Sequence, residues 1–188
     1  EYVMISEDMS MKTGPLLSPD SYKKFIFKHM KRLVEFLISN GVKYIAVDTD
    51  GNCDLLIPIL LDAGVDAIWP FERAADNDPV AARKKFGKSL RIWGGVDKRE
   101  LFKGKKEIDE HLKTFMPLIE EGGFIPTVDH TVSPEVSLGN FNLFSQKILK
   151  ILKDKELSSK LSKEAKIEAQ KFDWSKISKK FIKILNKK

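Results

Sequence analysis

The sequence has little of the material from which cross-links and membrane spans are built. Its 188 residues include one cysteine, Cys53, which excludes an internal disulfide and fits a reducing cytoplasm. The longest apolar run, LLIPILL at 55–61, is far shorter than the roughly 20 residues of a spanning helix. No charged segment followed by an apolar one opens the sequence. We therefore expect a cytoplasmic protein with no signal peptide and no membrane partner.

Acidic residues are scarce near the C-terminus. Residues 145–188 contain 14 lysines and five acidic residues, so the other 144 residues carry a net charge of −3, against +6 for the whole chain. A basic segment attracts nucleic acid or acidic lipid. These lysines lack the interleaved aromatic residues of a stacking surface, however, so we interpret them as a solvated helical face and do not expect nucleic acid as a partner. The composition divides the chain into residues 1–142 and a basic helical tail at 143–188.

Short apolar segments recur along the first 140 residues, and each ends in polar residues. Such nearly continuous apolar segments are typical of strands buried on both faces of a parallel sheet. The predicted strands are YVMISED (2–8), KYIAVDTD (43–50), DAIWPFE (66–72), SLRIWGGVD (89–97) and GFIPTVDH (123–130).

Helical segments with clear start and stop signals separate these strands. Ser18 before Pro19, and Asp78 before Pro79, are typical N-caps followed by a first-turn proline. The first of these helices should end at Gly41 and the second at Gly87. Further helices are predicted over 55–63, over 105–121 with a bend at Pro117, and from Ser133-Pro134 onward.

The alternation of strands and helices predicts right-handed βαβ units and an α/β fold. No G-x-G-x-x-G is present, which disfavours a dinucleotide-binding sheet. All five strands end in an acid or a histidine, and the carboxyl rim of a (β/α)8 barrel is where such residues act. We therefore predict part of a TIM-type barrel.

The segment YIAVDTDGNCDLL, at 44–56, has three possible interpretations. As a calcium loop it has Cys53 where glycine belongs and Ile59 where a bidentate glutamate belongs. As an Asp-x-Asp sugar-nucleotide motif it does not suit the repeated βα pattern. As a barrel rim it places Asp48 and Asp50 on one face of the strand, while Asp54 falls in the next helix. Asp48 and Asp50 could then bind a ligand or bond to neighbouring loop amides.

Five longer stretches resemble the C-terminal half of the uroporphyrinogen decarboxylase superfamily, over residues 3–142. They are SEDMSMKTGPLLSPDSYKKFI, GVKYIAVDTDGN, LLIPILLDAGVDAIWPFE, KKFGKSLRIWGGVDK and GGFIPTVDHTVSPEVSLGNF. The resemblance implies a (β/α)8 barrel that decarboxylates a tetrapyrrole acetate or transfers a methyl group with a corrinoid. The arginine-rich substrate-binding segment of the family is absent from this sequence.

The resemblance also bears on individual residues. His130 resembles the histidine that follows the last strand in the decarboxylases, so His130 and Asp129 are candidate catalytic residues. Asp48 and Asp50 stand where the methyltransferases have His-x-Cys, so these two and His130 are candidate ligands for zinc, or for magnesium or manganese. The remaining rim acids are candidate substrate-binding residues: Glu7, Asp8, Glu72 and Asp97.

The tail resembles a different family. Its sequence ILKDKELSSKLSKEAKIEAQKFDWSKISKKFIKIL is similar to the closing helices of GT-B glycosyltransferases, with Phe172 and Trp174 forming a Phe-x-Trp turn. Five strands also cannot close a barrel that needs eight. An inactive or dimerising fragment and a glycosyltransferase-related fragment therefore remain alternatives to an enzyme with a tetrapyrrole, a methyl donor or a corrinoid protein as partner.

Overall fold

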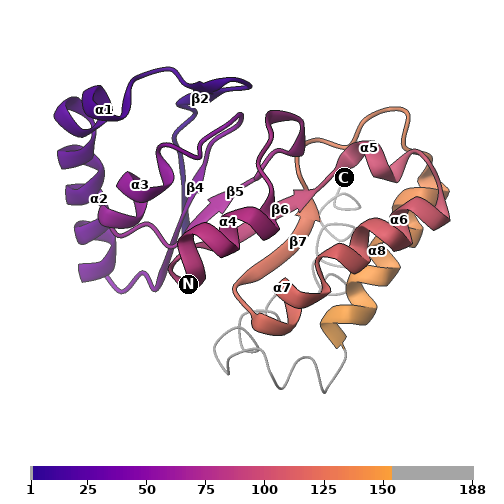
Figure 1. Ribbon diagram of the computed structural model, residues 1–188. Helices are drawn as coiled ribbons and strands as arrows, with labels where there is room; N and C mark the ends of the chain where they lie inside the picture. The colour runs from indigo at the N-terminus through magenta and orange to yellow at the C-terminus, as the bar shows by residue number, and fades with distance from the viewer. Residues whose placement is uncertain (1, 154–188) are drawn as a thin grey trace, which may run out of the picture.

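A five-stranded parallel sheet forms the centre of the computed structural model, which describes residues 2–153 (Figure 1). The strands follow one another in the order β1-β4-β5-β6-β7, and every neighbouring pair is parallel. This confirms the α/β fold and the βα order expected of part of a barrel. The strand bounds are β1 (Tyr2–Ser6), β4 (Tyr44–Asp48), β5 (Ala67–Trp69), β6 (Arg91–Val96) and β7 (Phe124–Val128).

Helices connect the strands in the predicted places. Ser18 caps α1 by accepting a hydrogen bond from the Ser21 N–H, and Asp78 caps α4 through the amides of residues 80 and 81, as predicted. The helix bounds are α1 (Pro19–Phe25), α2 (Phe27–Ser39), α3 (Ile57–Asp62), α4 (Pro79–Phe86), α5 (Lys98–Leu101), α6 (Lys105–Thr114), α7 (Met116–Glu121) and α8 (Leu138–Lys153), with 3-10 turns η1 (Arg73–Ala75) and η2 (Gly87–Ser89).

Some predicted bounds are wrong. All five strands end earlier than predicted, and of the acids assigned to their ends only Asp48 lies within a strand, as the last residue of β4. The others lie in the loops beyond. The helix predicted over 105–121 is two helices, because Phe115 ends α6 and Pro117 stands in the first turn of α7. Ser133-Pro134 does not open the last helix. Instead Ser137 accepts a hydrogen bond from the Asn140 N–H, and α8 begins at Leu138.

A small antiparallel hairpin was not predicted. It pairs β2 (Ser10–Met11) with β3 (Gly14–Pro15) and lies between β1 and α1 in the chain. The Asn52 N–H donates to the carbonyl of Met11, which fastens the hairpin to the loop after β4. This segment therefore borders the stretch that contains Asp48 and Asp50.

One face of the sheet forms the hydrophobic core with the helices. Its strand side chains include Ile45, Val47, Ile68, Ile92 and Val96, each at most 1% exposed. They pack with apolar side chains from the helices, such as Val34, Leu60 and Leu118. Burial of such side chains stabilises the fold by about 1.5–3 kcal/mol each. The helices are thus held on the outer face of the sheet.

The opposite face is concave. Tyr2 on β1 and Trp93 on β6 lie on this face, and their ring centroids are 5.7 Å apart although two strands separate them. Three strand spacings on a flat sheet would be about 14 Å. The sheet therefore curves as a barrel wall does, with aromatic side chains on its inner face.

Helix α8 crosses the predicted boundary at residue 142, so the division into two parts stays a prediction. Residues 154–188, with the predicted glycosyltransferase-like tail, lie outside the described residues. Among residues 2–153, no helix has both the length and the apolar composition to cross a membrane.

Candidate active site at the carboxyl rim

The loops that follow the strands contact one another at the carboxyl edge of the sheet. At the ends of β1 and β4, the Ser6 hydroxyl donates to Oδ2 of Asp48 at 3.4 Å. In the loops that follow, the Asp50 N–H donates to Oδ1 of Asp8 at 3.2 Å. The predicted convergence of these strand ends is therefore present on this side of the sheet.

His130 and Asp50 form the longest-range contact of the rim. His130 Nε2 lies 3.3 Å from Asp50 Oδ2, and the two residues follow β7 and β4, between which β5 and β6 intervene. His130 Nδ1 lies 2.8 Å from the Thr131 hydroxyl. Both side chains remain accessible, with exposed fractions of 32% for His130 and 41% for Asp50. The curvature of the sheet thus brings together two residues that the sequence predicts in one site.

Asp48 stands beside this pair. Partial burial and the neighbouring charge of Asp50 raise the pKa of Asp48, while the Ser6 hydroxyl and His130 act in the opposite direction. A carboxyl group in this setting takes up a proton more readily than an ordinary aspartate. Asp48, Asp50 and His130 therefore combine hydrogen-bond acceptors with groups able to exchange protons.

Glu7 is directed toward α1 rather than toward His130. The Tyr22 hydroxyl donates to Oε1 of Glu7 at 3.2 Å, and burial together with the Glu7 charge raises the pKa of Tyr22. Tyr22 is itself among the most buried side chains of the core. Glu7 thus fixes the position of α1 against the rim.

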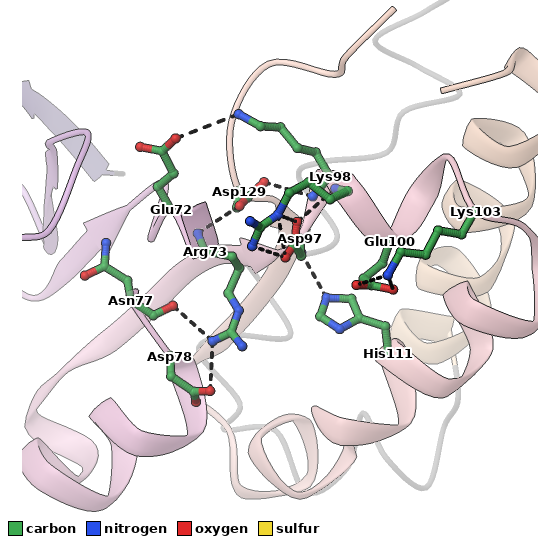
Figure 2. Close-up of polar contacts among 11 residues, drawn as sticks. Glu72, Arg73, Asn77, Asp78, Asp97, Lys98, Glu100, Lys103, His111 and Asp129 are labelled. Atoms are coloured by element: carbon green, nitrogen blue, oxygen red, sulfur yellow. Dashed lines mark hydrogen bonds and ion pairs between the residues drawn. The ribbon is translucent and has the colours of Figure 1, made fainter. Parts of the chain in front are cut away.

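Asp129 is fully buried, unlike its neighbour His130. Its side chain has an exposed fraction of 0%, and its two oxygens accept the backbone N–H groups of Arg73 at 2.8 Å and Lys98 at 3.0 Å (Figure 2). Burial raises the pKa of Asp129, and these two hydrogen bonds oppose the rise. Asp129 therefore joins the loops after β5 and β6, and of the predicted catalytic pair only His130 is open to a ligand.

Asp97 has a similar supporting position. It is the N-cap of α5, and its carboxylate accepts hydrogen bonds from the Arg99 backbone and, at 2.7–3.1 Å, from the Arg99 guanidinium. Although burial opposes the change, these bonds lower the pKa of Asp97. The carboxylate predicted to bind substrate is thus occupied by its own helix.

Glu72 connects the loops after β4, β5 and β6. Its Oε2 accepts the Gly51 N–H at 3.2 Å, and its Oε1 lies 3.8 Å from the ammonium nitrogen of Lys98. The adjacent Arg73 donates to the carbonyl of Asn77 at 3.0 Å and pairs with Asp78 at 2.9 Å. Sequence reasoning considered only the acids of the rim and missed these cations, although both adjoin predicted strand ends.

His111 contributes from outside the strand loops. Its Nε2 accepts the backbone N–H of Asp97 at 2.9 Å, which requires the neutral imidazole with its proton on Nδ1 (Figure 2). Burial lowers the pKa of His111. This position could not be recognised from the sequence, because the contact is made by the backbone of Asp97 and leaves no mark on the pattern of residue types.

Within residues 2–153, no three side chains of histidine, cysteine, aspartate or glutamate are grouped closely enough to hold a metal ion. Asp48, Asp50 and His130 are neighbours, but only the Asp50–His130 pair is in direct contact. The predicted metal site stays a prediction. Cys53 is fully buried, and burial raises its pKa to about 12, which removes it as a thiolate ligand or nucleophile near neutral pH.

Comparison with known proteins gives consistent matches. The sequence model of the uroporphyrinogen decarboxylase (URO-D) family matches residues 1–150. A uroporphyrinogen decarboxylase from Myxococcus xanthus (strain DK1622) is 27% identical over 124 residues, in a match that covers 64% of this chain and 33% of that protein. A solved methyltransferase from Methanosarcina mazei has a TM-score of 0.54 at 15% identity, covering 80% of this chain and 42% of that one, and this likeness shows the fold. The chain spans well under half the length of either protein.

Proposed function

The chain belongs to the uroporphyrinogen decarboxylase family, and we propose that its rim binds a tetrapyrrole and supplies the proton that removal of an acetate carboxyl group requires. The observation that carries the proposal is the contact between His130 and Asp50 across the curved sheet. Among residues 2–153, it is the one rim contact that joins an accessible imidazole to an accessible carboxylate.

Decarboxylation breaks the bond between the acetate methylene carbon and its carboxyl carbon, and carbon dioxide leaves without the bonding electrons. The remaining electron pair is delocalised into the pyrrole ring and is then used to bond a proton, which leaves a methyl group. Imidazole is well suited to deliver that proton near neutral pH. A carboxylate in contact with the ring fixes the orientation of the imidazole, as Asp50 would for His130.

The other accessible carboxylates suit the centre of a tetrapyrrole. Pyrrole N–H groups are hydrogen-bond donors, and Asp48 and Asp50 are acceptors at one end of the rim. The aromatic inner face below them includes the contacting pair Tyr2 and Trp93. Flat conjugated rings and aromatic side chains bury apolar area efficiently against one another.

Turnover of uroporphyrinogen by the whole chain tests the proposal. The substrate is incubated without oxygen, the products are oxidised, and their carboxyl groups are counted by chromatography and mass spectrometry. We expect products with fewer carboxyl groups. His130→Ala should slow turnover by about 100-fold or more, because a positioned general acid contributes about 10²–10⁴. Asp50→Asn should slow it less, since the imidazole remains.

His29→Ala is the matched control, because His29 is an exposed histidine on α2, remote from the strand ends in sequence. Its turnover should equal that of the unchanged chain. A chain that leaves all carboxyl groups in place, or a His130→Ala variant with full activity, would refute the proposal. Elemental analysis of the same samples tests the alternative of methyl transfer. A metal that is bound by the unchanged chain and lost in both Asp50→Ala and His130→Ala would support that alternative.

A further inference from the structure

Lys98 is a cation whose surroundings leave it short of partners. Its side chain is only 21% exposed, and its nearest anionic partner among residues 2–153 is Glu72 at 3.8 Å, beyond hydrogen-bond length. Lys103, which is 45% exposed, reaches both oxygens of Glu100 at 2.7 and 2.8 Å. An ammonium group has three donors, and leaving them unused in a partly buried position is costly. Lys98 is thus prepared for an anionic partner.

Hydrogen bonds hold both members of the Lys98–Glu72 pair in place, so the distance of 3.8 Å between them is fixed by the fold. The backbone N–H of Lys98 is bound by the buried carboxylate of Asp129 at 3.0 Å. Glu72 is bound through its other oxygen to the Gly51 N–H at 3.2 Å. Figure 2 shows the Lys98 side chain extending from α5 toward Glu72. The ammonium group of Lys98 is therefore kept at the rim with N–H donors that Glu72 does not use.

The neighbouring cations already have close hydrogen-bond partners. Of the three cationic residues that follow β5 and β6 directly, Arg73 is directed to Asn77 and Asp78, and Arg99 makes three hydrogen bonds to Asp97. Lys98 differs from both, since it has a longer and weaker contact. Of these three cations, Lys98 is therefore the one with hydrogen-bond donors left for a carboxylate.

We propose that Lys98 binds a carboxylate group of the ligand. The inference rests on the proposed function and deepens it, since a polycarboxylate ligand must find a cation in a rim otherwise lined by acids. Glu72, predicted as a substrate-binding residue, would repel such a ligand, and its contact with Lys98 at 3.8 Å is too long to occupy the ammonium. The ligand class is a tetrapyrrole with several carboxylate side chains.

Binding of uroporphyrin, the oxidised and unreactive form of the substrate, tests the assignment through quenching of tryptophan fluorescence. Lys98→Gln should weaken binding by about 10-fold or more, because a charge-assisted hydrogen bond is lost. Glu72→Gln should bind as tightly as the unchanged chain or more tightly, since it removes a repelling charge and keeps an acceptor for Gly51. Lys103→Gln is the matched control, in the turn that follows α5, and should bind normally.

The opposite signs separate ligand binding from a structural role. If Lys98→Gln binds uroporphyrin normally, or if Lys98→Gln and Glu72→Gln weaken binding equally, the pair is only a structural tie and the inference is overturned. If no uroporphyrin binds to the unchanged chain, the proposed function fails, and titration with succinate followed by amide NMR decides the inference alone. Shifts at Lys98 and Gly51 that vanish in Lys98→Gln support an anion site, and their absence overturns it.

Discussion

Gly94→Ala should destabilise the protein by about 2–6 kcal/mol, because the backbone of β6 passes unusually close to the segment that leads into the rim. A Cβ added at Gly94 would lie 1.8 Å from the carbonyl oxygen of Pro70, and φ at this residue is +110°. The next amide, of Gly95, donates to that same oxygen at 3.0 Å. Strained backbone costs about 1–3 kcal/mol, and overpacking adds about 1–3 kcal/mol.

For a chain of this length, that loss corresponds to a melting temperature lower by about 5–20 °C. Urea unfolding followed by circular dichroism measures the free energy, and thermal unfolding measures the shift. Gly41→Ala is the matched control, since its φ is +87° and nothing lies within 4 Å of the added Cβ. Its cost should be about 1–2 kcal/mol, from backbone strain alone. Equal losses in the two variants would refute the close approach of β6 to Pro70.

Two further predictions concern residues that support the rim and the sheet. Burial lowers the pKa of His111 from its ordinary value of 6.5, so between the folded and unfolded values the unfolded chain binds more protons. The stability that His111 contributes is therefore complete above pH 6.5 and falls as the pH falls. In urea unfolding, His111→Gln should lose less stability than the unchanged chain between pH 7 and 5. An identical pH dependence of the two proteins would contradict this. Arg83→Met should cost about 3–5 kcal/mol, because its buried guanidinium donates to two carbonyl oxygens of the loop after α7 at 2.9 Å. Arg91→Met removes an exposed ion pair and should cost less than about 1 kcal/mol, so similar losses would argue against the burial of Arg83.

The order of elements was predictable because the signals that set it are local. Ser18 and Asp78 bond to amides within three residues, so their helix starts follow from the sequence alone. The five strands were recognisable because both of their faces are apolar over most of their length. Their ends were placed too late, because an acid following a strand continues the same alternation of faces without belonging to the sheet.

The misplaced start of α8 has a different cause. Ser133 before Pro134 has the same composition as Ser18 before Pro19, yet only the latter caps a helix. At the second position the backbone makes an isolated turn, in which the Val136 N–H bonds to the Ser133 carbonyl, and the cap is formed four residues later by Ser137. The two motifs differ in their tertiary surroundings, and a sequence pattern does not record those.

The sequence indicated which residues lie at the rim. It did not indicate which of the rim acids are buried and which are accessible to a ligand. Asp129 and Asp50 both follow an apolar strand, and nothing in residue type separates them. The structure places one beneath the loops at 0% exposure and the other at the surface beside His130. This difference depends on loops from three other strands, which meet only in the folded chain.

The contacts of the rim explain why it contains so many acids. Several of the loops that follow the strands direct backbone N–H groups to rim carboxylates, which are strong acceptors for them. Asp129, Glu72 and Asp8 each accept such an amide from a loop other than their own. A rim acid therefore more often joins two loops than contacts a ligand. The groups left for chemistry are those that are accessible or that make only long contacts, which are His130 with Asp50, and Lys98. Substitution of an acid that joins two loops should consequently lower the stability of the protein more than it changes ligand binding. Substitution of His130 or Lys98 should change ligand binding or turnover more than it lowers stability.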